Sequence, residues 1–164
     1  MACRGVHFAL SDGDRAKLIQ LVETRGDVIG FIQEEIEERW DADWLCETDK
    51  AWDAIHRCLT NGTLSADDST PRHWCILNGS QMYVGSDYIV SFVDKADAQS
   101  VADAIEPIAR EEFRSKYDAI DPDDYGVPLS DEDFEYTWAY FTELRVFFRK
   151  AANANRSVLF SVDQ

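Results

Sequence analysis

The sequence predicts an α+β fold in one domain, residues 1–164, with a small mixed or antiparallel sheet of short strands packed with about six helices. Three observations predict this class. Strand-like segments open and close the chain, the helical segments between them do not alternate regularly with strands, and no linker is long enough to divide the chain. With 45% hydrophobic residues, the chain is able to bury a substantial core.

The N-terminal third is predicted to hold one strand and two helices. Alternating apolar residues predict a strand over 4–10. Ser11 is expected to cap a first helix that ends at Gly26, and Asp27 a second helix that runs to about Asp41. The apolar residues of this second helix are expected to face the core: Val28, Phe31, Ile32, Ile36 and Trp40. Its other face would carry four glutamates: Glu34, Glu35, Glu37 and Glu38.

A third helix is expected near residue 50. Thr48 or Asp49 would cap it, and it would run to about Thr60 and end at the Asn61-Gly62 pair. Glycine and asparagine adopt the left-handed backbone conformation more readily than other residues, so this pair is typical of a helix end. A polar loop over residues 62–71 is predicted to follow.

Short strands are predicted in the middle of the chain. Residues 73–77 and 81–84 are expected to form a hairpin through Asn78-Gly79, because this dipeptide is favoured in two-residue hairpin turns. Residues 88–93 carry apolar side chains on both faces, which indicates a strand in the interior of the sheet.

The C-terminal half is predicted to be mostly helical. Its expected boundaries are a cap at Asp94 or Asp97, a break near Glu106 ahead of Pro107, a cap at Ser130 and a helix end at about Asn153. Residues 121–128 are predicted to form a turn-rich acidic loop before the last helix. A closing strand over 157–162 is expected to pair with the first strand, which would bring both ends of the chain onto one sheet.

The negative charge is concentrated in two segments of the chain. Residues 27–49 hold nine carboxylates and one base, and residues 118–143 hold nine carboxylates and no base. The rest of the chain is nearly neutral, with 14 acidic and 15 basic residues, so these segments account for the formal net charge of −16. Surfaces with one sign of charge select their partners by charge, and we expect the two segments to fold into a single anionic surface.

Composition and motifs exclude several classes of function. Direct binding to nucleic acid or to anionic membranes needs clustered Lys and Arg, which this chain lacks. No apolar run is long enough to span a membrane, and the first residues do not resemble a signal peptide. The spacing of the four cysteines, Cys3, Cys46, Cys58 and Cys75, matches no zinc or redox motif. We therefore expect a cytoplasmic protein with reduced thiols and no cofactor.

No metal site is expected either. The separations of His7, His56 and His73 do not indicate a shared ion. The aspartates at 121–124 superficially resemble a calcium loop, but its glutamate is missing and prolines interrupt the pattern.

The third predicted helix carries a possible small-molecule site. Trp52 and His56 are four residues apart on one helix face, beside the pair Asp49 and Asp53. A functional interpretation makes His56 an acid or base that a carboxylate orients, in an accessible apolar cleft. The structural alternative places Trp52 in the core and His56 at its edge.

The last helix carries aromatic residues outside its apolar stripe. Tyr136 and Tyr140 lie near the carboxylates at its N-terminus, an arrangement that suits an interface with a basic protein. The structural alternative is that a wide helix packs on two neighbours. The candidate binding residues are therefore Glu34, Glu38, Asp41, Asp49, Trp52, His56, Asp123, Asp124, Tyr125, Glu132, Glu135 and Tyr136.

Several segments resemble the YfbM-like family, an uncharacterised bacterial family of about this length. Residues 48–56, TDKAWDAIH, resemble its LDKAWxxLH helix, although Thr48 stands where an apolar residue is expected. Residues 79–93 lie where that family has a glycine-containing strand pair, with Gly85-Ser86-Asp87 in place of a glycine-proline step. The ending, TELRVFFRKAA and SVLF, resembles the family's close. The resemblance implies an α+β fold and no established activity, cofactor or substrate.

The leading hypothesis is a non-enzymatic binding protein that presents an acidic face to a basic protein. Its concrete form is an immunity protein that covers the cleft of a toxin. The alternative is a small-molecule-binding protein or enzyme that uses the Trp52/His56 pocket. A third possibility is that the acidity only keeps an ordinary protein soluble.

Overall fold

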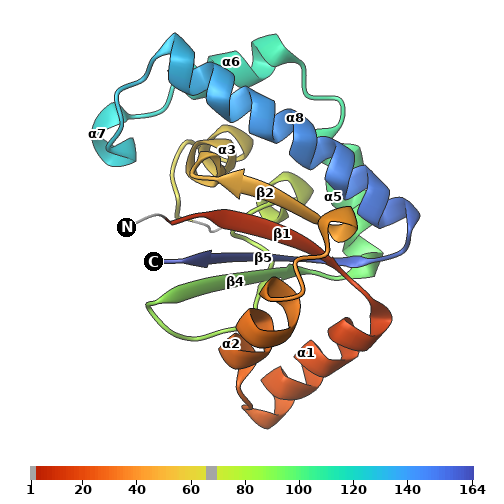
Figure 1. Ribbon diagram of the computed structural model, residues 1–164. Helices are drawn as coiled ribbons and strands as arrows, with labels where there is room; N and C mark the ends of the chain where they lie inside the picture. Colours follow the sequence, from red (N-terminus) through yellow and green to blue (C-terminus); the bar gives the residue numbers. More distant parts are fainter. Residues whose placement is uncertain (1–2, 66–69) are drawn as a thin grey trace.

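A five-stranded antiparallel sheet lies between two layers of helices in the computed structural model, which describes residues 3–65 and 70–164 (Figure 1). The strands follow the order β2-β1-β5-β4-β3, and all neighbours are antiparallel. Their bounds are β1 Gly5–Leu10, β2 Leu45–Asp49, β3 Ser80–Gln81, β4 Tyr88–Val93 and β5 Ser157–Asp163. The predicted α+β class is confirmed.

The helices divide between the two faces of the sheet. The lower face in Figure 1 is covered by α1 Asp12–Thr24, α2 Val28–Phe31 and the π-helix η1 Ile32–Glu37. The upper face is covered by α3 Ala51–Leu59, α5 Lys95–Ile105, α6 Arg110–Asp118 and α8 Asp131–Asn153. Three short helices complete the described chain: η2 Ala42–Trp44, α4 Pro71–Trp74 and α7 Pro122–Tyr125.

The two-residue period of the strands produces two hydrophobic cores. Successive side chains of a strand point to opposite faces. In β1, Val6 and Phe8 belong to the core under α1 and α2, whereas Ala9 belongs to the core under α3, α5 and α8. In β5, Leu159 belongs to the core under α1 and α2, and Phe160 belongs to the core under α3, α5 and α8. A helix on one side of the sheet therefore does not share its core with a helix on the other.

The first and last strands pair as the sequence predicts. β1 and β5 are antiparallel, with Val6 opposite Ser161 and Leu10 opposite Ser157. The start of β1 and the end of β5 consequently lie side by side (Figure 1). β4 lies between β5 and β3 and is buried over its second half, which confirms its predicted interior position.

Several predicted helix boundaries are also confirmed. Ser11 caps α1 and Asp94 caps α5 with their side chains. The chain breaks at Glu106, and Ser130 caps α8 by accepting a hydrogen bond from the Asp133 N–H at 3.0 Å. Gly26 is not the left-handed residue that ends α1, because Arg25 takes that role with φ 54°.

The predicted hairpin at Asn78-Gly79 is wrong. Pro71 starts helix α4 where a strand was expected, since its fixed φ suits the first turn of a helix. Gly79 instead passes close to β4, where an added Cβ would lie 2.5 Å from the Phe92 carbonyl oxygen. The glycine therefore allows a close approach of two segments. Residues 66–69 of the predicted polar loop lie outside the described residues.

β2 was not predicted, and neither Thr48 nor Asp49 caps a helix. Both residues belong to this strand, and α3 follows Lys50 without a side-chain cap. Thr48 is fully buried, and its hydroxyl donates to the Gly5 carbonyl oxygen at 3.1 Å. That bond explains a threonine at a position where the resemblance predicts an apolar residue.

The second predicted helix differs at its C-terminal end. Asp27 caps it as expected, accepting from the Gly30 N–H at 2.8 Å, but the chain is π-helical over η1 and the helix ends at Glu37. Trp40 has φ 42° and is 43% exposed, so it does not face the core. Glu37 turns inward and accepts from Ser161 at 3.1 Å, so only the other three glutamates form the outer face.

Candidate binding surface

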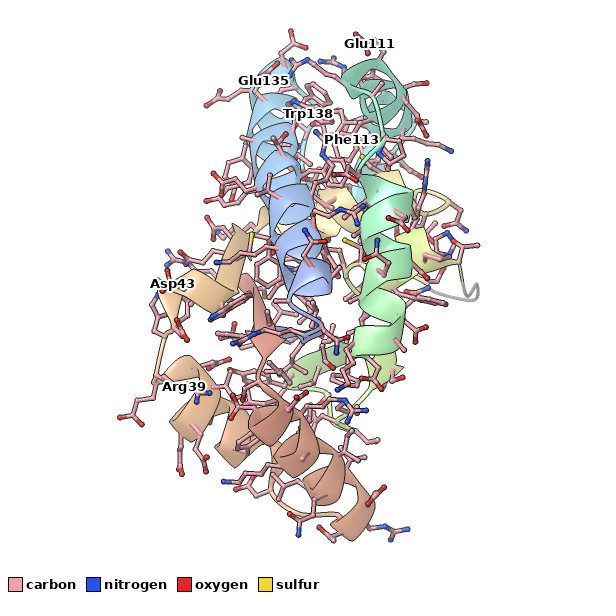
Figure 2. The ribbon with its side chains drawn as sticks, turned by 90° about the vertical axis from the view of Figure 1, so that its right-hand side faces the viewer. Arg39, Asp43, Glu111, Phe113, Glu135 and Trp138 are labelled. Atoms are coloured by element: carbon pink, nitrogen blue, oxygen red, sulfur yellow. The ribbon has the colours of Figure 1, made fainter. Side chains whose placement is uncertain are left out.

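The two acidic segments do not form one surface. Glu34 and Glu38 are exposed on η1, on one side of the sheet, whereas Asp123 and Glu132 are exposed on α7 and α8 beyond the other. Figure 2 shows Asp43 of the first segment well separated from Glu135 of the second. The expectation of a single anionic surface is therefore wrong for the η1 glutamates, which the sheet separates from α7 and α8, whereas Asp43 and Glu47 of the first segment lie with Glu143 of the second along one groove.

Arginines neutralise part of the second segment. Four of its nine carboxylates form ion pairs: Asp124 with Arg57, Glu135 with Arg110, and both Asp118 and Asp131 with Arg114. Among the candidate residues, no ion pair with a described residue involves Glu34, Glu38, Asp41, Asp123 or Glu132. The candidate carboxylates that form no ion pair are thus spread over η1, the segment after it, α7 and α8.

A groove of about 630 Å³ runs between β2 and α8, and we call it the β2–α8 groove. The segment that includes β2 contributes Leu45, Cys46 and Glu47, and α8 contributes residues from successive turns: Ala139, Tyr140, Glu143, Val146, Phe147 and Lys150. Val146 is 69% exposed although it is apolar. Apolar side chains thus line a groove that also carries exposed carboxylates.

The charges in the β2–α8 groove are mostly negative. Asp43, Glu47 and Glu143 are exposed and form no ion pair within the described residues. Lys150 is the opposing charge, but its ammonium donates to the Asp43 carbonyl oxygen and lies 4.4 Å from the centre of the Trp44 ring. Because this lysine is already engaged, the rest of the groove is anionic.

The β2–α8 groove also borders a free strand edge. Within the described chain β2 pairs only with β1, so its outer backbone groups have no strand beside them. An unpaired edge offers N–H and C=O groups to an extended segment of another chain. Burial, together with the nearby Glu143 and Glu47, raises the pKa of Cys46 to about 12, so the thiol on this strand is neutral.

Two tyrosines of α8 lie in contact at the end of the groove, where Tyr140 lines it. Tyr136 and Tyr140 have ring centroids 5.0 Å apart in an edge-on arrangement. The Tyr136 hydroxyl donates to Asp49 at 2.9 Å, and burial together with this bond raises the pKa of Tyr136 to about 12. Asp49 also lies 3.4 Å from Arg4. The structure thus brings together the candidates Asp49 and Tyr136, 87 residues apart in the sequence.

Beyond Tyr136 lies a second cavity of about 410 Å³, which we call the tyrosine pocket. It is lined by aromatic, apolar and acidic side chains: Trp52, Asp53, Tyr125, Val127, Asp133 and Tyr136, with Cys3 and Lys50. Asp133 Oδ2 accepts hydrogen bonds from Tyr117 at 2.6 Å and from Tyr125 at 3.1 Å. The pocket therefore joins the start of α3, the end of α7 and the first turns of α8.

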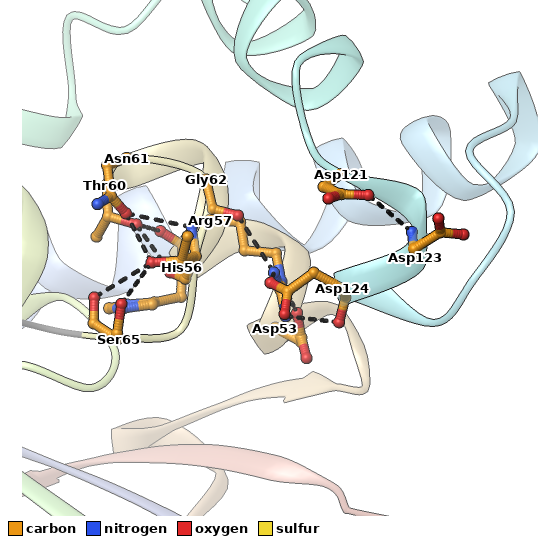
Figure 3. Close-up of polar contacts among 11 residues, drawn as sticks. Asp53, His56, Arg57, Thr60, Asn61, Gly62, Ser65, Asp121, Asp123 and Asp124 are labelled. Carbon is orange, nitrogen blue, oxygen red and sulfur yellow. Dashed lines mark hydrogen bonds and ion pairs between the residues drawn. The ribbon is translucent and has the colours of Figure 1, made fainter.

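Arg57 holds α7 against α3 beside this pocket. Its side chain is 3% exposed and pairs with Asp53 at 2.6 Å and with Asp124 (Figure 3). It also donates to the Gly62 carbonyl oxygen at 3.2 Å. Arg57 was not among the residues predicted from the sequence, although its four-residue spacing from Asp53 is typical of such a pair. The Asp123 N–H donates a hydrogen bond to the Asp121 side chain, so Asp123 takes part only in a local turn.

His56 does not reach either cavity. It is fully buried, and neither ring nitrogen has a hydrogen-bond partner. Burial lowers its pKa to about 4, with smaller contributions from His73 and Arg57. The interpretation of His56 as an accessible acid or base is therefore wrong. Trp52 is also mostly buried, and its indole N–H donates to the Cys3 carbonyl oxygen at 3.0 Å, but its ring lines the tyrosine pocket.

Within residues 3–65 and 70–164, no group of three or more His, Cys, Asp or Glu side chains is arranged to hold a metal ion. In the same residues no helix combines the length and apolar character needed to cross a bilayer. All four cysteines are free thiols.

Comparisons with known proteins agree with the fold and leave the activity open. The family model described as "Domain of unknown function (DUF1877)" matches residues 1–161. The crystal structure of YfbM from Escherichia coli, a protein of unknown function, is similar with a TM-score of 0.70, at 16% identity over 97% of this chain and 99% of that one. No curated protein matches significantly. The YfbM-like resemblance is thus confirmed, and at this identity the structural likeness shows the fold alone.

Proposed function

This chain belongs to the DUF1877 family, and we propose that it is a non-enzymatic binding protein that holds an extended, basic segment of a partner protein in the β2–α8 groove. The observation that carries the proposal is the coincidence of a free strand edge with a groove that both apolar and acidic side chains line.

Each part of the groove has a role in this proposal. The outer edge of β2 would pair with the backbone of the partner segment, as in other cases of strand addition. Apolar side chains of the segment would contact Val146 and Leu45. Its Lys or Arg side chains would face Glu47 and Glu143, which form no ion pair within the described residues. Complementary charge of this kind raises the association rate and makes it fall with added salt.

A concrete form of this function is toxin neutralisation. An immunity protein that covers a basic, nucleic-acid-handling surface needs an acidic face and no catalytic machinery of its own. We also propose that the protein acts in the cytoplasm, because its four free thiols suit a reducing compartment.

The test is a pull-down with the products of neighbouring genes, repeated at low and at high salt. The double variant Glu47→Lys, Glu143→Lys reverses the charge of the groove. Its matched control is Glu34→Lys, Glu38→Lys, which makes the same change in net charge on the opposite side of the sheet. We expect a basic partner that the groove variant loses, that the control retains, and that high salt weakens.

Two results would contradict the proposal. One is the absence of any basic partner at either salt concentration. The other is a partner that the η1 control loses and the groove variant retains, which would move the interface to the opposite side of the molecule. Strand addition has its own check, since Glu47→Pro removes a backbone donor from the edge strand and introduces a ring there.

A further inference from the structure

The tyrosine pocket has a different chemistry from the groove. Aromatic rings from three helices line it, and its acidic residues are partly buried: the Asp53 side chain is 23% exposed. In the β2–α8 groove the carboxylates are exposed at the sides. A cavity of about 410 Å³ is within the size range of small-ligand sites.

Two carboxylates line this pocket from different helices. Asp53 belongs to α3 and Asp133 to α8, and both line the cavity. Burial raises the pKa of Asp53 despite its bond with Arg57, and the charges of Asp124 and Asp133 raise it further. Asp53 is already paired with Arg57, whereas Asp133 forms no ion pair within the described residues, so a cation in the pocket would be attracted chiefly by Asp133.

The aromatic rings show which kind of cation fits. The faces of Trp and Tyr attract ammonium groups through their quadrupoles, and they also exclude water from the alkyl part of the ligand. Tyr136, Trp52 and Tyr125 line the cavity, although the Arg57 guanidinium already lies 5.7 Å from the centre of the Tyr125 ring, and Val127 adds an apolar contact. A bare metal ion would need more oxygen ligands than the two carboxylates provide.

From this geometry we infer that the tyrosine pocket binds an alkylammonium group, with its charge between Asp53 and Asp133 and its carbon atoms against Tyr125, Tyr136 and Trp52. The group is carried either by a free amine or by a lysine side chain of a protein. The inference does not depend on the β2–α8 groove, because it concerns a separate cavity and a ligand that fits it alone.

Lys50 is the basic residue among those that line the pocket, and replacing it tests the charge of the ligand. Its side chain is exposed, so it is able to extend into solvent when a cation enters. Removing its charge in Lys50→Met should tighten the binding of an amine, on the order of threefold. An anionic ligand would bind more weakly to the same variant, so the direction of the change identifies the charge of the ligand.

The experiment is a titration of the whole protein with butylammonium, followed by the NMR shifts of the backbone amides around the pocket. Butanol is the neutral control, since it has nearly the same shape without the charge. We expect butylammonium to bind about tenfold more tightly than butanol and to shift the amides of Gly126 and Lys50. Tyr125→Leu and Asp133→Asn should each weaken butylammonium binding by a similar factor.

A matched variant controls for the loss of a tyrosine. Tyr83 also donates its hydroxyl to an aspartate, Asp87, at 2.9 Å, but it lies outside the pocket. Tyr83→Leu should therefore leave amine binding unchanged. Equal binding of butanol and butylammonium, no shift near the pocket with either, or weaker amine binding by Lys50→Met would each overturn the inference. Since Lys50 is exposed, this last variant is expected to fold even if Asp133→Asn does not.

Two further ligands distinguish the sources of the amine. A blocked Gly-Lys-Gly peptide and its counterpart with norleucine in place of lysine differ only in the ammonium group. Tighter binding of the lysine peptide than of butylammonium assigns the pocket to a protein side chain. Equal or weaker binding of that peptide assigns it to a free amine.

Discussion

Buried ionisable side chains are the residues whose roles depend most on their surroundings. Arg57 is almost fully buried and is stabilised by two carboxylates, Asp53 and Asp124, that the chain supplies from α3 and α7. His7 and His56 are buried without any carboxylate partner and are therefore neutral. Charged side chains are retained in an interior only where a partner offsets the loss of hydration.

Replacing Arg57 should destabilise the protein. Arg57→Met leaves two carboxylates without their partner and frees the Gly62 carbonyl oxygen. We expect a loss of about 3 kcal/mol in the free energy of unfolding, measured by urea denaturation. The control is Arg72→Met, which breaks an ion pair with Glu112 that is exposed on both sides and should cost less than about 1 kcal/mol. Equal losses in the two variants would contradict the role of Arg57.

The two buried histidines should make stability fall in mild acid. Burial lowers the pKa of both His7 and His56 to about 4, from an unfolded value of 6.5. Between these values the unfolded state binds more protons than the folded state, so stability decreases as the pH falls below about 6.5. The decrease should approach about 1.4 kcal/mol per pH unit for each histidine.

Urea unfolding between about pH 7 and about pH 5 measures this dependence, above the range where most carboxylates titrate. The His56→Leu variant should lose about half of the dependence of the unfolding free energy on pH. A slope that is unchanged in that variant would mean that other groups, such as the carboxylates, cause the effect.

At the scale of single elements, edge strand β2 shows why short segments are hard to predict. Its five residues include two carboxylates, and only Cys46 and Thr48 are buried. The strand forms because β1 is available beside it, with a register shift between Gly5 and Val6. The segment 73–77 shows the reverse case, since His73 and Trp74 belong to α4, which starts at Pro71, and residues 75–77 form a turn instead of the expected strand.

The register shift in β1 should depend on Gly5. An added Cβ would lie 2.6 Å from Phe160, 2.8 Å from Thr48 and 2.9 Å from Trp52, all in a packed interior. Gly5→Ala should therefore cost about 2 kcal/mol and loosen β2, as measured by amide hydrogen exchange. Gly13→Ala is the matched control, since its Cβ on α1 would meet only Ser11 Oγ at 3.9 Å. That variant should be neutral or slightly stabilising.

For the whole molecule, the sheet decides where the charges lie. It separates the glutamates of η1 from the carboxylates of α7 and α8, which belong to different layers. The net charge of −16 therefore acts over the entire surface rather than at one face. Local pairs such as Arg110 with Glu135 offset part of it.

A charge of this size should make stability increase with salt. Self-repulsion destabilises a compact chain, and salt screens it. We expect the urea midpoint to rise between low salt and about 0.5 M sodium chloride, and to rise less in Glu34→Lys, Glu38→Lys. A midpoint that falls with salt would show that the ion pairs outweigh the net repulsion.

The sequence by itself determined the fold class, the pairing of the first and last strands, and caps such as Ser11, Asp27 and Ser130. The caps and the positions of the strands depend on hydrogen bonds between neighbouring residues and on local periodicity, which a single segment already contains, and the class and the strand pairing were inferred from the order of these segments. The tertiary structure alone decided that Asp49 meets Tyr136, that Asp53 approaches Asp133, and that His56 is enclosed. Such contacts join residues far apart in the chain, and their geometry exists only after the helices have packed on the sheet.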